Sequence, residues 1–351
     1  MRDGVLMHRG KPYAGIGANY DTLLGRLLAD KANTSTLTNL AALAKKGIPF
    51  VRFRACGFYP KNWELYLHDR PEYFRRFDLV VRAAEKAGIG LIPSLFWKLG
   101  TVPQIVGEPA SEMGNPRSKT AAFMKTYTRE VVSRYQDSPA IWGWEFANAP
   151  NMVVDLRGKA RSATNPEEEK GLSSAQIRTA MTMFAETVRS IDRTRIIEPG
   201  NSVPRPGAWH RAQGNAGQRD SAEQSYEVLY SLTPDPMDVT SVHIYFKPQH
   251  LAPYGPETLS QFLARYVRAT AKRGKPLFIG EFPLLDQARA TETLRAITEN
   301  RVPLAAFWVF DHPSQEAHMN VSFENERSAL LDLVVQANRE LSAAVGISPG
   351  L

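Results

Sequence analysis

The chain has 351 residues, of which 43% are hydrophobic and 23% are charged, as is usual for a soluble globular protein. Lysine and arginine number 43 against 36 for aspartate and glutamate, but the basic residues are interleaved with acidic ones, which argues against a nucleic-acid partner. No run of eighteen apolar residues is present, which argues against a membrane span, and the single cysteine, Cys56, excludes an intrachain disulfide and a cysteine-based zinc site.

The first residues, MRDGVLMHRGKPYAG, contain neither the apolar segment nor the small-residue cleavage site of a signal peptide. This fits a cytoplasmic protein, and it equally fits a secreted or periplasmic protein expressed without its leader. The sequence gives no expectation for the oligomeric state.

Short apolar runs typical of β-strands alternate with amphipathic segments of helical period, and no linker interrupts the alternation. Eight strands are predicted, at 13–20, 50–55, 90–97, 140–148, 195–202, 238–246, 276–282 and 304–311. The clearest helical patterns between them cover 36–47, 72–88, 121–135, 176–191 and 259–274.

Three of these helical patterns end in a glycine that follows lysine or arginine, at Gly47, Gly88 and Gly274, and a strand begins shortly afterwards. Eight such units predict a closed (β/α)8 TIM barrel, formed by one domain over residues 1–351. A doubly wound open sheet is the alternative, but no glycine-rich phosphate-binding motif follows any strand.

Two connections are longer than a barrel requires, residues 151–173 after strand four and residues 203–224 after strand five. Both would emerge at the C-terminal face of the barrel, where active sites of this fold are built. We therefore expect them to be walls of a substrate cleft, with a surface insertion as the plainer alternative.

Polar side chains near the C-terminal ends of the strands are the candidates for chemistry. They are Arg52, Arg54, Trp97, Asn148, Glu198, Asn201, His243, Tyr245, Glu281, Trp308 and Asp311. Glu281 follows an apolar run, and a buried carboxylate needs a cation or several donors, for which Arg52 is suitable. A carboxylate held in this way is prepared to attack a sugar's anomeric carbon, although a purely structural Glu–Arg pair remains the alternative.

Retaining glycoside hydrolysis needs a second carboxyl group, which protonates the leaving oxygen. The position that should supply it, in the segment IWGWEFANAPN, holds Ala149.

At this point the sequence resembles the clan A glycoside hydrolases, especially the cellulase and mannanase branch of family 5. The segment WEFANAP is similar to the family signature W-E-x-x-N-E-P with Ala149 in place of the second glutamate. The segments VRF at Arg52, HIY at 243–245, IGEF at 279–282 and the strand-eight Trp308 match the family in the same order, so the resemblance spans strands two to eight.

The resemblance implies that Glu281 is the nucleophile and that position 149 is the acid/base position. Asn148 would bind the sugar's 2-hydroxyl, Arg52 and Tyr245 would steady the nucleophile, His243 would line the site and Trp308 would form its floor. The expected partner is a β-linked oligo- or polysaccharide. No metal-binding motif is present, so neither a metal nor another cofactor is expected.

Three explanations of Ala149 remain open. It is a substitution that disarms a retaining glycosidase, or the chain is a natural glycan-binding pseudoenzyme, or Glu198 or Glu145 serves as the acid. Glu145 fits poorly, because four residues along a strand place it ~13 Å deeper in the barrel. Trp63, Trp97 and Trp209 are candidates for stacking on sugar rings, with Trp97 favoured.

Overall fold

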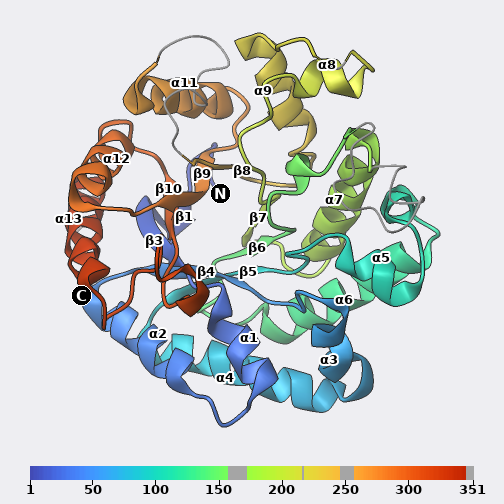
Figure 1. The fold of residues 1–351 in the computed structure, drawn as a ribbon, viewed down its shortest axis with the longest axis horizontal. Coiled ribbons are helices and arrows are strands. Elements are labelled where there is room, and N and C mark those ends of the chain that lie inside the picture. The colour runs from blue at the N-terminus through green and yellow to red at the C-terminus, as the bar shows by residue number, and fades with distance from the viewer. Residues whose placement is uncertain (157–171, 216, 246–256, 345–351) are drawn as a thin grey trace.

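The computed structural model describes residues 1–156, 172–215, 217–245 and 257–344. Eight parallel strands form a barrel, with the spatial order β7-β6-β5-β4-β3-β10-β9-β8, and helices surround them (Figure 1). The strands are β3 (Gly15–Asn19), β4 (Phe50–Arg54), β5 (Gly90–Ser94), β6 (Gly143–Glu145), β7 (Ile196–Glu198), β8 (Thr240–His243), β9 (Leu277–Pro283) and β10 (Leu304–Trp308). The predicted TIM barrel is confirmed, and every predicted strand overlaps an observed one.

The seam between the first and last strands of this order is closed by single hydrogen bonds. The Asp238 N–H donates to the Ile197 carbonyl oxygen at 2.9 Å, and the Ile197 N–H donates to Asp238 Oδ2 at 2.9 Å. Further along, the Asn201 N–H donates to Ser241 Oγ at 2.8 Å. These bonds hold β7 beside β8, so that the strand ends form a ring.

Each of the five predicted helical segments overlaps an observed helix, and the structure adds further helices. The observed helices are α1 (Thr22–Ala29), α2 (Ser35–Lys46), α3 (Glu64–His68), α4 (Arg70–Ala87), α5 (Thr101–Val106), α6 (Lys119–Tyr135), α7 (Ser174–Arg189), α8 (Ala208–Ala212), α9 (Ala222–Ser231), α11 (Leu259–Ala271), α12 (Gln287–Glu299) and α13 (Leu330–Ala344). The predicted ones among them are α2, α4, α6, α7 and α11. In the described parts of the chain, none of the helices combines the length and apolar character that a membrane span requires.

Capping residues explain where several helices begin and end. Ser173 starts α7 with a capping box, since its hydroxyl accepts from the Gln176 N–H and the Gln176 side chain accepts from the Ser173 N–H. Gly47 and Gly88 end α2 and α4 in the left-handed conformation, as predicted. Gly274 is also left-handed, but α11 already ends at Ala271, so this glycine belongs to the following turn.

The N-terminal end of the barrel is filled and covered. A short hairpin, β1 (Met7–His8) and β2 (Lys11–Pro12), precedes the first barrel strand. A cluster of buried side chains packs here: Leu6, Phe50, Ile92, Ile196, Val239, Phe278, Leu304 and Ala306. Polar side chains therefore gather at the opposite, C-terminal ends of the strands.

Candidate active site

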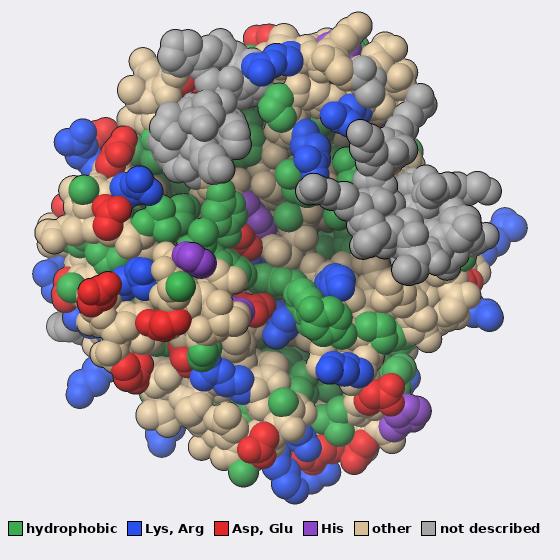
Figure 2. All heavy atoms as spheres, viewed as in Figure 1, with side chains coloured by type: hydrophobic (Ala, Val, Ile, Leu, Met, Phe, Trp, Pro, Cys, Tyr) green, Lys and Arg blue, Asp and Glu red, His purple; other side chains and the backbone are tan. Residues whose placement is uncertain are grey.

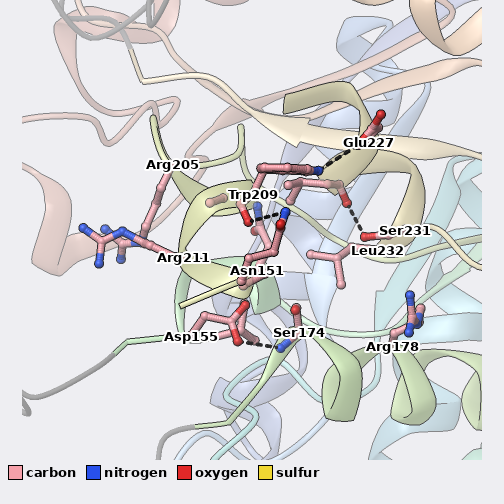
Figure 3. A pocket seen from close by; sticks show the side chains of 15 residues that line it. Asn151, Asp155, Ser174, Arg178, Arg205, Trp209, Arg211, Glu227, Ser231 and Leu232 are labelled. Carbon is pink, nitrogen blue, oxygen red and sulfur yellow. Dashed lines mark hydrogen bonds between the residues drawn. The ribbon is translucent and has the colours of Figure 1, made fainter. Parts of the chain in front are cut away.

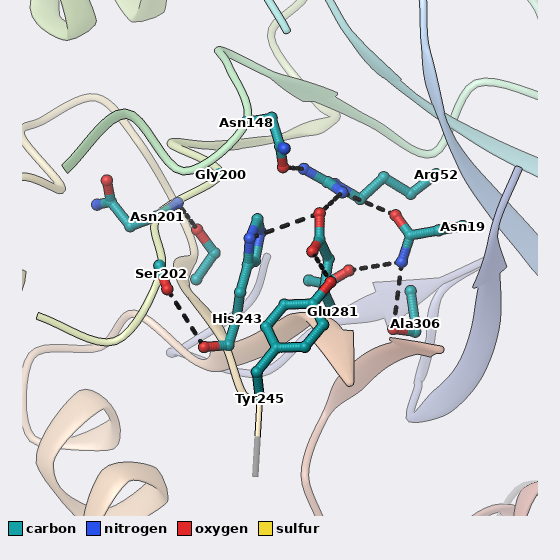
Figure 4. A network of polar contacts seen from close by, with 12 residues as sticks. Asn19, Arg52, Asn148, Gly200, Asn201, Ser202, His243, Tyr245, Glu281 and Ala306 are labelled. Atoms are coloured by element: carbon teal, nitrogen blue, oxygen red, sulfur yellow. Dashed lines mark hydrogen bonds and ion pairs between the residues drawn. The ribbon is translucent and has the colours of Figure 1, made fainter. Parts of the chain in front are cut away.

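Arg52, on β4, is the centre of the site, and all five of its N–H donors are used. Arg52 Nε donates to Glu145 Oε2, and Arg52 Nη2 donates to Glu145 Oε1 at 2.8 Å. Nη2 also donates to Asn148 Oδ1 at 2.8 Å. Nη1 donates to Asn19 Oδ1 at 2.7 Å and to Glu281 Oε1 at 3.0 Å (Figure 4). Four strands are thus tied to one buried cation, and we call these five residues the Arg52 network.

Burial lowers the pKa of Arg52, but Glu145 and Glu281 more than offset this effect and hold the pKa above its usual value. The guanidinium group is fully buried. Removing one partner of such a buried pair typically costs ~3–5 kcal/mol, because the other charge is left without compensation. The network is therefore a fixed part of the barrel mouth.

Glu281, on β9, is 4% exposed and points toward the interior of this network. The Tyr245 hydroxyl donates to Glu281 Oε2, and Arg52 donates to Oε1. Burial raises the pKa of Glu281, while Arg52 and Tyr245 oppose that rise. Burial is the larger effect and leaves the pKa of Glu281 above its usual value, while the two donors stabilise the ionised carboxylate.

His243, at the end of β8, contacts the same carboxylate as a neutral ring. Its Nδ1 lies 3.5 Å from Glu281 Oε1, but burial and Arg52 hold the pKa of His243 well below its usual value, so no ion pair forms. A Cβ atom at Gly280 would lie 2.8 Å from His243 Nε2. The glycine before Glu281 is thus required for the ring to lie against β9.

Position 149, the predicted acid/base position, is held in an uncommon backbone conformation. Ala149 has φ 46° and ψ 46°, in the left-handed region, where a residue with a Cβ atom pays roughly 1–2 kcal/mol. Its N–H donates to the Gly200 carbonyl oxygen at 2.8 Å, and it directly follows Asn148 of the Arg52 network. Strained backbone of this kind clusters at functional sites, which supports a functional role for position 149.

The two loops that leave β6 and β7 are joined immediately beyond this position. Asn151 Nδ2 donates to the Ser202 carbonyl oxygen at 2.7 Å, and the Ser202 N–H donates to Asn151 Oδ1 at 2.8 Å. Gly200 has φ +75°, and a Cβ atom there would lie 1.7 Å from the Ala147 carbonyl oxygen. A glycine is therefore needed for the two chains to approach this closely.

A second carboxyl group lies behind Glu145. Glu198 is paired in register with Glu145 on the neighbouring strand, and both side chains are fully buried. Glu198 Oε2 accepts from the Gly200 N–H at 2.7 Å. Burial and the neighbouring Glu145 carboxylate raise the pKa of Glu198 well above its usual value, which favours the protonated form of Glu198 beside Glu145. A side chain bound in this way does not extend to a leaving group at the mouth.

This protonated acid predicts a pH-dependent effect of Glu198→Gln. Because the folded-state pKa is raised, the stability due to Glu198 is complete below its unfolded pKa of ~4.3 and is lost as the pH rises toward the folded pKa. Glutamine keeps the donor and acceptor without titrating. The variant should gain stability over the original chain above about pH 4.3, by at most ~1.4 kcal/mol per pH unit.

Denaturant unfolding between pH 4 and 8 checks this expectation, with Glu292→Gln on the exposed face of α12 as the matched control. Glu198→Ala removes the buried partner of Glu145 and should be destabilising by ~1–3 kcal/mol. If the difference in stability between the original chain and the Glu198→Gln variant does not change with pH, Glu198 is not held protonated.

Two tryptophans flank the network. The Trp97 and Trp308 rings are nearly parallel, at 26°, with their centroids 6.1 Å apart, and Arg52 lies 4.5 Å from the centre of the Trp97 ring. Trp97 is only 5% exposed, whereas Trp308 is partly exposed and offers more surface to a ligand. Trp63 packs in the core at 1% exposure, so it is not available to a sugar, and Trp209 lies on the separate α8.

The structure thus brings most of the predicted site residues together. Of the remaining strand-end candidates, Arg54 lies beside Asp21 at 3.7 Å, and Asp311 pairs with Arg26 at 2.9 Å, outside the Arg52 network. Asn19 was not predicted, since its only signal in the sequence is a polar residue at the end of an apolar strand. Asn19 Nδ2 donates to the carbonyl oxygens of Gly280, Ala306 and Phe307, which binds β3 to β9 and β10.

The space-filling view shows a hollow near the middle of the molecule, where hydrophobic side chains gather with single acidic, basic and histidine side chains among them (Figure 2). In the described part of the chain, no group of three or more His, Cys, Asp or Glu side chains is placed to hold a metal ion. The site is a fixed carboxylate with hydrogen-bond donors and aromatic surface, at the C-terminal end of a (β/α)8 barrel. Barrels of this class use carboxylate side chains at the C-terminal ends of their strands to act on sugars.

The chain belongs to glycosyl hydrolase family 5, the cellulase family, which it matches over residues 18–312. It is 32% identical over 138 residues to mannan endo-1,4-beta-mannosidase A of Podospora anserina, a stretch that covers 37% of this chain and 32% of that protein. The match therefore spans about a third of that relative's length.

Solved structures share the fold across nearly the whole chain. The endo-1,4-beta-mannanase of Rhizomucor miehei superposes with a TM-score of 0.70 at 17% identity, over 98% of this chain and 99% of that one. An exo-beta-1,4-mannosidase from an Opitutaceae bacterium gives a TM-score of 0.66 at 16% identity, over 98% of this chain and 62% of that one. At these identities the likeness concerns the fold.

Proposed function

We propose that this chain is a form of a retaining glycoside hydrolase that acts on β-linked oligo- or polysaccharides, and that Ala149 stands where the active form has glutamate. The observation that carries the proposal is the Glu281 carboxylate, which two donors, Arg52 and Tyr245, orient at the barrel mouth. Membership of glycosyl hydrolase family 5 supports it.

In the proposed double displacement, Glu281 attacks the anomeric carbon and forms a covalent glycosyl ester as the bond to the leaving oxygen breaks. A glutamic acid at position 149 protonates that oxygen, and its carboxylate then takes a proton from the water that hydrolyses the ester. His243 lines the site as a neutral ring, because its pKa is held well below its usual value, and so it adds no second positive charge beside Arg52. Asn148 keeps its amide group for the sugar's 2-hydroxyl, since Oδ1 is already bound to Arg52.

With alanine at position 149 no group donates the first proton, so this chain should bind glycans and turn them over slowly. The left-handed backbone at position 149 and the hydrogen bonds between Asn151 and Ser202 hold this segment in place although position 149 has no carboxylate. This favours a substitution in an otherwise complete enzyme. A natural glycan-binding pseudoenzyme is the alternative. It predicts sugar binding that Glu281→Gln barely alters and a glutamate variant at position 149 that stays inert.

We propose β-1,4-linked mannosides as the substrate class, because the relative and both solved structures described above are named for that linkage. Their names include both endo- and exo-acting enzymes. A panel of β-mannans, β-glucans, xylan and short β-mannosides, incubated with the Ala149→Glu variant, tests the assignment. Release of sugar from mannan-type substrates is expected, and an inert variant across the panel would refute the proposed function.

A further inference from the structure

A pocket of about 260 Å³ lies where the two long loops after β6 and β7 meet (Figure 3). Asn151 and Asp155 line it from the first loop, and Arg205, Trp209 and Arg211 line it from the second. The start of α7 and the inner face of α9 complete its walls. The pocket therefore depends on the two insertions that exceed what a barrel requires.

Two arginines in this pocket lie close together, and no acidic side chain among the described residues pairs with either of them. The Arg205 and Arg211 side chains extend to the same side (Figure 3), and burial and the charge of Arg211 both lower the pKa of Arg205. Among the described residues, neither guanidinium group forms an ion pair. Arg205 Nη2 donates to the Met152 carbonyl oxygen at 2.8 Å, while Arg205 Nε is buried without a partner.

The acidic side chains of the pocket are engaged elsewhere. Asp155 Oδ1 accepts from the Ser174 N–H at 3.1 Å, and Glu227 Oε2 accepts from Trp209 Nε1 at 2.7 Å. Two neighbouring positive charges repel each other, and an oxyanion placed between them would relieve that repulsion while filling unused N–H donors. The arrangement is suited to a carboxylate or a similar group.

The pocket adjoins the segment that carries position 149, since Asn151 lines it. Asn151 is two residues beyond Ala149, so the two Cα atoms are at most ~7 Å apart. The acid must stand at the leaving oxygen, and the aglycone continues beyond it. Since Arg205 also binds the backbone of Met152, the arginine pair is attached to the same segment.

We propose that this pocket receives the aglycone and that Arg205 and Arg211 recognise an oxyanion, such as a carboxylate, that the aglycone carries. This inference rests on the proposed function, because it takes position 149 as the place where the aglycone leaves. Among the β-glycosides of the proposed substrate class, those with an acidic group on the leaving side should therefore be preferred.

Because the chain with Ala149 should not cleave its ligand, calorimetry can measure binding directly. Carboxyphenyl β-mannoside and its neutral carboxamide differ only in the charge of the aglycone. The carboxylate should bind roughly tenfold more tightly, as a charge-assisted hydrogen bond implies. Arg211→Met, and the double change Arg205→Met with Arg211→Met, should reduce that ratio toward one.

The matched control is the pair Arg295→Met with Arg339→Met, which removes two exposed arginines from α12 and α13 and should leave the ratio unchanged. Arg211→Met alone leaves the hydrogen bond between Arg205 and Met152 in place, so it keeps the test valid if the double variant folds poorly. Equal affinity for the two glycosides overturns the proposal. Binding of inorganic phosphate alone, measured by the same calorimetry, would also overturn the proposal, because it would indicate a site for free anions. Hydrolysis of neutral glycosides by Ala149→Glu tests the proposed function separately.

Discussion

Replacing Ala149 with glutamate should raise the rate of hydrolysis of natural β-glycosides by ~10²–10⁴-fold or more, because a general acid contributes about that much. The gain should depend on the leaving group. A sugar alkoxide needs a proton as it departs, whereas a dinitrophenolate does not, so the first step with a dinitrophenyl glycoside should change little. Steady-state rates on both kinds of substrate measure the difference.

Ala149→Gln is the matched control for this result, since glutamine has nearly the size of glutamate but donates no acidic proton. It should remain as slow as the chain with alanine. An equal gain with glutamine and glutamate would mean that position 149 acts through packing. The absence of any gain with glutamate would favour the glycan-binding pseudoenzyme.

Glu281→Gln, introduced together with Ala149→Glu, should abolish the restored hydrolysis. The rate should fall by roughly 10⁴-fold or more, as it does when other enzymes lose a nucleophile that works together with further catalytic residues. Glutamine keeps one oxygen that can accept from Arg52, and its amide N–H can donate to the Tyr245 hydroxyl, but it does not form the glycosyl ester. The loss should therefore appear in kcat with little change in the affinity for substrate.

The stability of the same variant separates catalysis from folding. Glu281 is a buried charge, and Arg52 retains Glu145 as its bidentate partner when Glu281 becomes neutral. Thermal unfolding should therefore occur at an equal or higher temperature than in the Ala149→Glu chain. Retained activity in a folded Glu281→Gln variant would show that another carboxylate is the nucleophile.

The barrel was predictable because its strands are apolar runs separated by helices of clear period. Strand ends were less predictable. Strand four was predicted over 140–148, but β6 covers only Gly143–Glu145. Phe146 and Ala147 beyond it are fully buried. At the barrel mouth the chain leaves the sheet while its side chains are still in the core, so apolar character does not mark where pairing stops.

The contacts of a strand-end residue were predictable where the neighbouring motif was distinctive. Glu281 and Arg52 form the expected pair. The contacts of Asn19 and Glu198 were not predicted, because their roles depend on which strands become neighbours. Glu198 faces Glu145 only through the register of β6 and β7. Such contacts join residues far apart in the sequence, and no local pattern records them.

The backbone conformation at position 149 could not be predicted from the sequence pattern either. A left-handed alanine is not signalled by its residue type, since alanine rarely adopts this conformation. The conformation follows from the close approach of Gly200 to Ala147 and from the hydrogen bonds between Asn151 and Ser202. The two loops must therefore be folded together before the backbone at position 149 has its conformation.

The central claim is that Glu281 is a nucleophile in a chain that lacks its acid. Mass spectrometry of this chain after incubation with a dinitrophenyl β-mannoside tests it most directly. We expect the intact mass to increase by one glycosyl unit, fragmentation to place that unit on Glu281, and azide to release it as the β-glycosyl azide. An unmodified chain, or a glycosyl unit on any other residue, would contradict the account.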